Sequence, residues 1–152
     1  MKALAAAQRQ TDKSLERLQK QVGGLSETIG GDIEDIAYFV VHRVLKRDLG
    51  WDVKELKRSW QTWGDQVEEI DFFGRAVDPK QKHKDIWIVG EAKHNLTIRQ
   101  VKKFSRIVER AKRYIIEGEI FPVCFCYRAH PTVQEAVRNA GFHLVFSYGE
   151  MI

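Results

Sequence analysis

The sequence predicts a mixed α/β domain whose elements follow the order α-β-β-β-α-β-α-β, preceded by an N-terminal helical extension. Two long stretches, residues 32–50 and 97–118, repeat apolar residues with the period of an amphipathic helix. Apolar, β-branched runs typical of strands lie at residues 67–73, 86–93, 121–127 and 142–148. The chain has 152 residues and is 43% hydrophobic, which suits one domain with a real core and an appendage.

Residues 1–29 are interpreted as a helical, coiled-coil segment, and residues 30–152 as the globular domain. Apolar side chains fall on the a and d positions of a heptad repeat at Leu4, Leu15, Leu18, Val22, Leu25 and Ile29. Gly23-Gly24 predicts a break in the helix and Gly30-Gly31 predicts the domain boundary, because paired glycines are unfavourable inside a helix. We expect a homodimer through this helix, although it could instead fold back on its own domain across the first break.

The first helix of the domain is expected to begin at Asp32, a good N-cap, and to end at Gly50. Its apolar stripe comprises Ile33, Ala37, Val40 and Val44. Glu34 borders the inward face of this helix, because it shares a face with Ala37 and Tyr38. Glu34 is therefore either an acid that interacts with the helix dipole or part of an inward-facing site.

An antiparallel hairpin is predicted to bring an aspartate and a glutamate together. The strands at 67–73 and 86–93 are joined by a charged turn that contains proline. In this hairpin Asp71 lies near Glu91. Lys93 projects from the same face as Glu91, because side chains alternate along a strand. Two carboxylates and a lysine are then expected to share one pocket.

The remaining elements complete the predicted order. Residues 51–60 are typical of an edge strand, Thr97 is expected to cap the second long helix, and residues 132–140 form a further helix. Cys124 and Cys126 point the same way inside a strand and are too few for a zinc site, so we expect buried thiols in a reducing cytoplasm. No apolar run reaches the roughly 18 residues of a membrane span, and no secretory signal is evident.

The spacing of Asp71 from Glu91-Ala92-Lys93, set in a strand, turn and strand, resembles the motif of the PD-(D/E)xK nuclease superfamily, which has the restriction-endonuclease-like fold. Ile70 stands where that motif usually has a proline. The resemblance covers residues 30–148, whose predicted elements follow the order of the superfamily core. The whole layout, including the heptad helix, also resembles a little-characterised prokaryotic family of coiled-coil-tethered PD-(D/E)xK proteins.

A carboxylate-bound divalent cation can neutralise a phosphodiester and activate water, and Asp71 and Glu91 are the expected ligands for Mg²⁺ or Mn²⁺. The resemblance implies that the Ala92 carbonyl also binds the metal, and that Glu34 does so directly or through water. Lys93 would position or activate the water and stabilise developing negative charge. Without metal, Asp71 and Glu91 would repel each other, and one would tend to keep its proton. The simpler interpretation, an exposed Glu91–Lys93 ion pair of little energetic value, stays open.

The second long helix is the candidate nucleic-acid-binding element. The net charge is only +4, a mild preference for polyanions, so the distribution of the basic residues matters more than their number. We expect phosphate contacts from Arg99, Lys102, Lys103 and Arg106, with His94 beside the motif. The alternative is that these side chains form the solvated face of an amphipathic helix, and that His94 is a solvated polar residue.

Taken together, the sequence and the resemblance predict a metal-dependent nuclease that hydrolyses phosphodiester bonds in nucleic acid, with DNA as the expected substrate. The alternative is a non-catalytic nucleic-acid-binding or scaffold protein that retains the fold. The clustered like charges of Glu34, Asp71 and Glu91 favour the enzyme, because a scaffold has no need of them.

Overall fold

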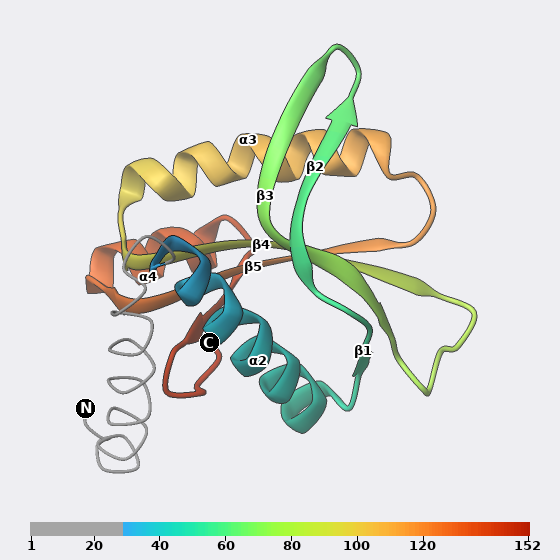
Figure 1. Ribbon diagram of the computed structural model, residues 1–152, viewed down its shortest axis with the longest axis horizontal. Coiled ribbons are helices and arrows are strands. Elements are labelled where there is room, and N and C mark those ends of the chain that lie inside the picture. Colours follow the sequence, from blue (N-terminus) through green and yellow to red (C-terminus); the bar gives the residue numbers. More distant parts are fainter. Residues whose placement is uncertain (1–28) are drawn as a thin grey trace.

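The computed structural model describes residues 29–152 (Figure 1). The elements are α2 (Ile29–Leu49), β1 (Asp52–Val53), β2 (Lys57–Trp63), β3 (Gln66–Val77), β4 (Asp85–Leu96), α3 (Ile98–Tyr114), β5 (Glu119–Ala129), α4 (Pro131–Asn139) and β6 (His143–Phe146). The predicted order of helices and strands is confirmed, apart from the edge strand, which is divided into β1 and β2.

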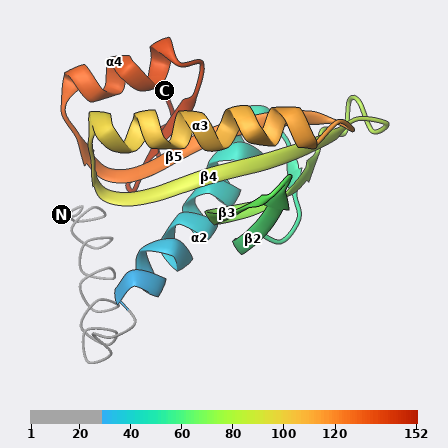
Figure 2. The same cartoon turned by 90° about the horizontal axis from the view of Figure 1, so that it is seen from above.

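The strands form one mixed sheet in the order β1-β3-β4-β5-β6, with β2 also paired to β3. The predicted antiparallel pairing of β3 with β4 is confirmed, and β4, β5 and β6 are parallel. Helix α2 covers one face of the sheet, and α3 and α4 cover the other (Figure 2). Parallel strands covered on both faces explain the nearly continuous apolar sequence of β5.

Each face of the sheet has its own apolar core. Below α2, Ala37, Val41 and Leu45 are fully buried against side chains of β3, β4 and β5. Below α3 and α4, the buried residues include Phe104, Cys124 and Cys126. The prediction that both cysteines are buried thiols is therefore confirmed, and each is free of a disulfide.

The predicted edge strand is divided because the chain between β1 and β2 passes close over Gly74 of β3. A Cβ at Gly74 would lie 2.3 Å from the carbonyl oxygen of Glu55 and 2.8 Å from the Leu56 side chain. Only a residue without a side chain permits this approach. The pairing of β2 with β3 then shifts register between Lys57 and Ser59, and such an irregularity turns side chains in a new direction.

The start of α2 differs from the prediction. The helix begins at Ile29 and continues through Gly30-Gly31, so the expected N-cap at Asp32 is wrong. Packing explains the difference, because Ile33 and Ile36 are already buried against the sheet, and tertiary contacts can outweigh a glycine penalty of about 1 kcal/mol. The predicted far end is close to the observed one, since α2 ends at Leu49 and Gly50 follows with a φ of 71°.

The predicted coiled coil of residues 1–29 lies almost entirely outside the described residues. Its heptad pairing, its role in a homodimer and the division of the chain at residue 30 therefore stay predictions. Within residues 29–152, no helix combines the length and the apolar character that crossing a membrane requires.

Candidate functional site

The pairing of β3 with β4 brings Asp71 and Glu91 together, as the sequence predicted. The last registered pair is Phe72 with Gly90, and the two acids follow immediately beyond it. Gly90 is required here, because a Cβ at this position would lie 2.0 Å from the ring of Phe72. The Phe72 ring can therefore lie directly across β4, which holds the two strands in register where the acids emerge.

Lys93 links the two acids. Its Nζ lies 3.9 Å from Oδ2 of Asp71 and 3.7 Å from Oε2 of Glu91. The backbone N–H of Ala92 donates a hydrogen bond of 2.9 Å to the same Asp71 oxygen. Asp71 is thus held by a charge and by a backbone donor, whereas Glu91 is held by the Lys93 side chain. These contacts exclude the interpretation of Glu91 and Lys93 as an exposed pair, since Glu91 is only 7% exposed.

Glu91 projects from β4 toward the side of the sheet covered by α3. Its register partner on β5 is Cys124, a buried residue of the core beneath α3. Burial, and to a smaller extent the charge of Asp71, raise the pKa of Glu91 to about 7, while Lys93 and Lys103 act in the opposite direction. A carboxyl group with this pKa exchanges its proton near neutral pH, which is a property of acids at reactive sites.

Glu34 is the second buried acid and lies in the first turns of α2. Both its oxygens accept hydrogen bonds from Arg58, one of them at 3.0 Å from Nε, and Arg58 also binds Glu69. Burial raises the pKa of Glu34, and the two bonds from Arg58 partly oppose that rise. The predicted inward position of Glu34 is confirmed, and its partner is a cation of the chain itself.

Arg58 and Tyr38 belong to this site and were not predicted. The Tyr38 hydroxyl donates a hydrogen bond to the carbonyl oxygen of Asp71 and accepts one of 2.9 Å from the backbone N–H of Arg58. It therefore joins α2 to β2 and β3. Neither role could be read from the sequence, because Arg58 was one of three basic residues in an expected edge strand and its direction depends on the shifted register.

The chemistry of the donors suits a divalent cation, but their present arrangement is not a finished site. Among residues 29–152, no three Asp, Glu, His or Cys side chains are grouped closely enough to hold a metal ion. Glu34 is bound to Arg58, and Lys93 contacts both Asp71 and Glu91. Two carboxylates and a backbone carbonyl are nevertheless the hard oxygen donors that Mg²⁺ prefers. The carbonyl of Ala92 faces β3 like its N–H, because both groups of a strand residue point to the same neighbour.

The expected nucleic-acid-binding residues lie along α3 and near the end of β4. Lys102 and Arg106 line a groove between α3 and α4, and Arg99 is exposed at the start of α3. Lys103 is the one whose charge reaches Glu91. The ring of His94 packs edge-on against Tyr127 at 5.0 Å, and desolvation and the charge of Arg128 lower its pKa.

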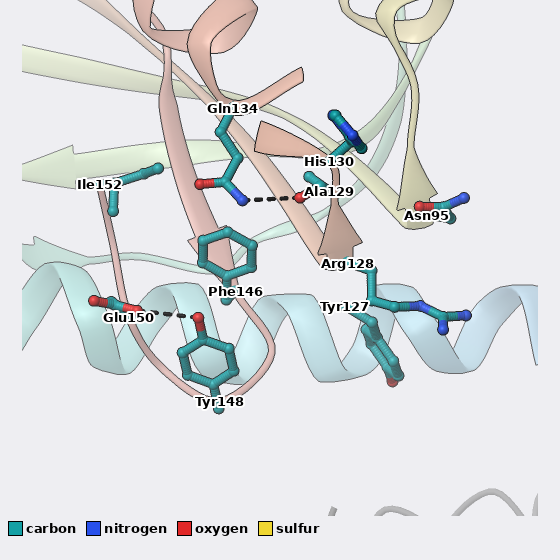
Figure 3. A pocket seen from close by; sticks show the side chains of 10 residues that line it. All are labelled: Asn95, Tyr127, Arg128, Ala129, His130, Gln134, Phe146, Tyr148, Glu150 and Ile152. Atoms are coloured by element: carbon teal, nitrogen blue, oxygen red, sulfur yellow. Dashed lines mark hydrogen bonds between the residues drawn. The ribbon is translucent and has the colours of Figure 1, made fainter. Parts of the chain in front are cut away.

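A separate pocket lies at the carboxyl ends of the parallel strands β4, β5 and β6 (Figure 3). Gln134 closes one side of it with a hydrogen bond to the carbonyl of Ala129, and Tyr148 donates to Glu150. Such strand ends commonly bind ligands in α/β proteins. The pocket contains none of the four predicted catalytic residues, although Asn95 in its wall is two residues beyond Lys93.

The fold and this cluster define a mixed α/β domain with a carboxylate–lysine site where the antiparallel pairing of β3 with β4 ends in a mixed sheet. The chain belongs to the family described as a domain of unknown function, DUF8196, whose profile matches residues 35–152. A comparison with curated proteins gives no match.

Two solved structures resemble the chain distantly. One is a repair endonuclease from Pyrococcus abyssi, with 11% identity, a TM-score of 0.44, and coverage of 68% of this chain and 43% of that chain. The other is EndoMS in apo form, with 6% identity, a TM-score of 0.39, and coverage of 70% and 44%. The matched region is thus less than half of either structure. The function proposed below rests on the side chains of the site.

Proposed function

We propose that this protein is a divalent-cation-dependent nuclease that hydrolyses phosphodiester bonds in DNA. The main support is the contact of Lys93 with both Asp71 and Glu91, at 3.9 and 3.7 Å, together with the burial of Glu91, whose pKa is about 7. Two acids and one lysine in contact provide ligands for a cation and a positive charge for a phosphate.

Asp71, Glu91 and the Ala92 carbonyl would hold Mg²⁺ or Mn²⁺, which supplies charge neutralisation and an acidified water. Lys93 lies beside both acids and would donate a hydrogen bond to a phosphate oxygen, where it stabilises the charge that develops during attack. Tyr38 fixes the backbone of Asp71. Glu34 would contribute through water, since its own oxygens are bonded to Arg58.

A non-catalytic nucleic-acid-binding protein is the second candidate. The observation that favours it is the pairing of Glu34 with Arg58, which already satisfies one acid of the expected metal site without any metal. In such a protein Arg58 and Lys93 would act as permanent counterions, and the carboxylates would have only a structural role.

A cleavage assay separates the two candidates. Full-length protein is incubated with DNA and RNA of several structures, with Mg²⁺, with Mn²⁺ and with a chelator. The nuclease proposal expects cation-dependent cleavage of DNA that is lost in Asp71→Asn and kept in Glu119→Gln, which removes an exposed glutamate of neighbouring β5. Metal-independent products, or equal cleavage by Asp71→Asn, would reject the proposal. Binding without cleavage would support the second candidate.

The homodimer is proposed on the heptad pattern, and because cleavage of both strands of a duplex by a one-site domain requires two sites. Light scattering on the full chain and on a protein that starts at Gly30 tests it, because only the former should be dimeric. A monomeric full-length chain, or a dimeric truncated one, would show that the N-terminal helix is not the dimerisation element.

A further inference from the structure

Strand β3 carries a β-bulge at Asp71. Between two registered pairs, the pairing advances by two residues on β2, from Lys57 to Ser59, but by three residues on β3. Arg58 of β2 therefore faces two residues of β3, Asp71 and Phe72. Two residues opposite one define a bulge, and the extra residue bends its strand and changes the direction of the side chains.

The buried residues of β3 confirm the bulge. Ile70 lies in the core beneath α3, whereas Phe72 lies in the core beneath α2. Residues two apart share one face in a regular strand, so the extra residue has reversed the alternation between them. The pairing of β3 with β4 also ends here, at Phe72 and Gly90, and Figure 1 shows the upper parts of β2 and β3 turned away from β4. The bulge thus lies where the two strands of the site separate.

The hydroxyl of Tyr38 bridges the bulge. It accepts a hydrogen bond of 2.9 Å from the backbone N–H of Arg58 and donates one of 3.3 Å to the backbone carbonyl of Asp71. These two groups belong to facing strands, so the phenol joins the strands at the point where their register is broken. The ring of Tyr38 packs edge-on against Phe72, with centroids 6.4 Å apart, and this contact orients the hydroxyl.

Helix α2 fixes both sides of the bulge. Glu34 lies one helical turn before Tyr38 and holds the side chain of Arg58 through two hydrogen bonds. On the opposite strand, Asp71 is held at its carbonyl by Tyr38 and at its carboxylate by the N–H of Ala92, at 2.9 Å. A continuous series of contacts therefore leads from α2 to a carboxylate oxygen of the proposed cation site.

We propose that Tyr38 is a positioning residue for this cation site: its hydroxyl fixes the bulge, and the bulge directs the Asp71 carboxylate toward Glu91 and Lys93. This inference rests on the proposed function. Groups that orient a ligand of a metal contribute to its affinity without touching the metal. Without the hydroxyl, the N–H of Arg58 and the carbonyl of Asp71 lose their common partner, and the Asp71 carboxylate is held less firmly.

Two measurements on the full-length protein test the proposal. Calorimetric titration of Mn²⁺ at pH 7 gives the cation affinity. Hydrogen exchange of the Ala92 amide, followed by NMR without metal, reports its bond to the Asp71 carboxylate. Tyr38→Phe removes the hydroxyl and keeps the ring, and Tyr38→Met serves if that variant is not folded by circular dichroism. The control is Tyr148→Phe, which removes a hydroxyl that donates to Glu150 in the separate pocket.

We expect Tyr38→Phe to weaken Mn²⁺ binding about tenfold to a hundredfold, as is typical when a group that orients a metal ligand is removed. The Ala92 amide should exchange faster in this variant. At saturating Mn²⁺ most of the DNA cleavage rate should return, because all the ligands are still present, whereas Asp71→Asn should not recover. Tyr148→Phe should match the unaltered protein in every measurement.

The outcomes separate this inference from the function on which it rests. Equal Mn²⁺ affinity in Tyr38→Phe and the unaltered protein would overturn the positioning role and leave the proposed nuclease in place. An equal loss in Tyr148→Phe would overturn it as well. If the unaltered protein binds no Mn²⁺, the proposed function fails, and the exchange of the Ala92 amide decides the rest. Faster exchange in Tyr38→Phe would still support the positioning of Asp71, and unchanged exchange would reject it.

Discussion

Glu34 and Glu91 are the two buried acids among the described residues, each 7% exposed, and their surroundings differ. Glu34 receives two hydrogen bonds from the fork of Arg58. Glu91 has the ammonium of Lys93 at 3.7 Å and the charge of Lys103, and it faces the like charge of Asp71. The two acids are therefore equally buried, but the chain compensates the charge of Glu34 more completely than that of Glu91.

The difference indicates separate roles. A buried carboxylate with a bidentate arginine is compensated and has little need of an external cation. A buried carboxyl group with a pKa of about 7 keeps its proton below neutral pH even beside Lys93. Glu91 is thus the acid that would lose a proton when a divalent cation binds. Glu34 is the acid that connects α2 to the hairpin.

The largest expected effect is on catalysis. Glu91→Gln should reduce cleavage by about a thousandfold or more, because it removes a proposed metal ligand, whereas Glu34→Gln should be milder. Single-turnover cleavage measures both. A greater loss for Glu34→Gln than for Glu91→Gln would reverse the assignment of roles.

The pH dependence of stability should follow next. The folded pKa of Glu91, about 7, lies above the ordinary value of 4.5, so the folded state holds this proton more tightly than the unfolded state. The associated stability is complete below pH 4.5 and is lost as pH rises to 7. Without metal, urea unfolding should show Glu91→Gln gaining about 3 kcal/mol over the unaltered protein across that range. A pH-independent difference between the two proteins would contradict this account.

Arg58→Met should destabilise the fold by about 2 kcal/mol, which is less than a fully buried pair would lose, because the Arg58 side chain is 35% exposed. The double variant with Glu34→Gln should lose less than the two single variants added together. Thermal unfolding gives the values, with Arg47→Met, an exposed arginine, as the control. Strict additivity would show that Glu34 and Arg58 are not coupled.

The smallest effect concerns Lys103. Its charge lowers the pKa of Glu91, so Lys103→Gln should raise that pKa further, while Lys102→Gln on the groove side should leave it unchanged. NMR titration of labelled glutamate carboxyl groups can resolve the change. The same shift in both variants would indicate a general charge effect of α3 instead of a local contact.

The sequence predicted the parts of this site that depend on strand alternation and on one hairpin. Asp71, Glu91 and Lys93 are in contact because side chains alternate and β3 pairs with β4. The capping of α3 by Thr97 was equally predictable, since Gln100 completes a capping box. Both features depend on residues close together in the chain or on one simple turn.

What the sequence could not predict depends on distant contacts. The pairing of Arg58 with Glu34 requires the close passage of the chain over Gly74 and the register shift in β2. Neither feature produces a periodic pattern in the sequence. Alternation along β2 places Trp60 and Trp63 on opposite faces, but which of them is buried depends on the packing of α3 against the hairpin. Patterns in the chain identify elements well, but they do not specify how one strand is offset against another.

Calorimetric titration of Mn²⁺ into the full-length protein at pH 6 tests most directly whether Asp71 and Glu91 together hold a divalent cation. The account predicts one binding site and the release of a proton, seen by comparing buffers of different ionisation heat, because Glu91 must lose its proton to bind. Glu91→Gln should lose the binding and Glu119→Gln should keep it. Equal binding by Glu91→Gln, or no binding by the unaltered protein at millimolar Mn²⁺, would contradict the central claim.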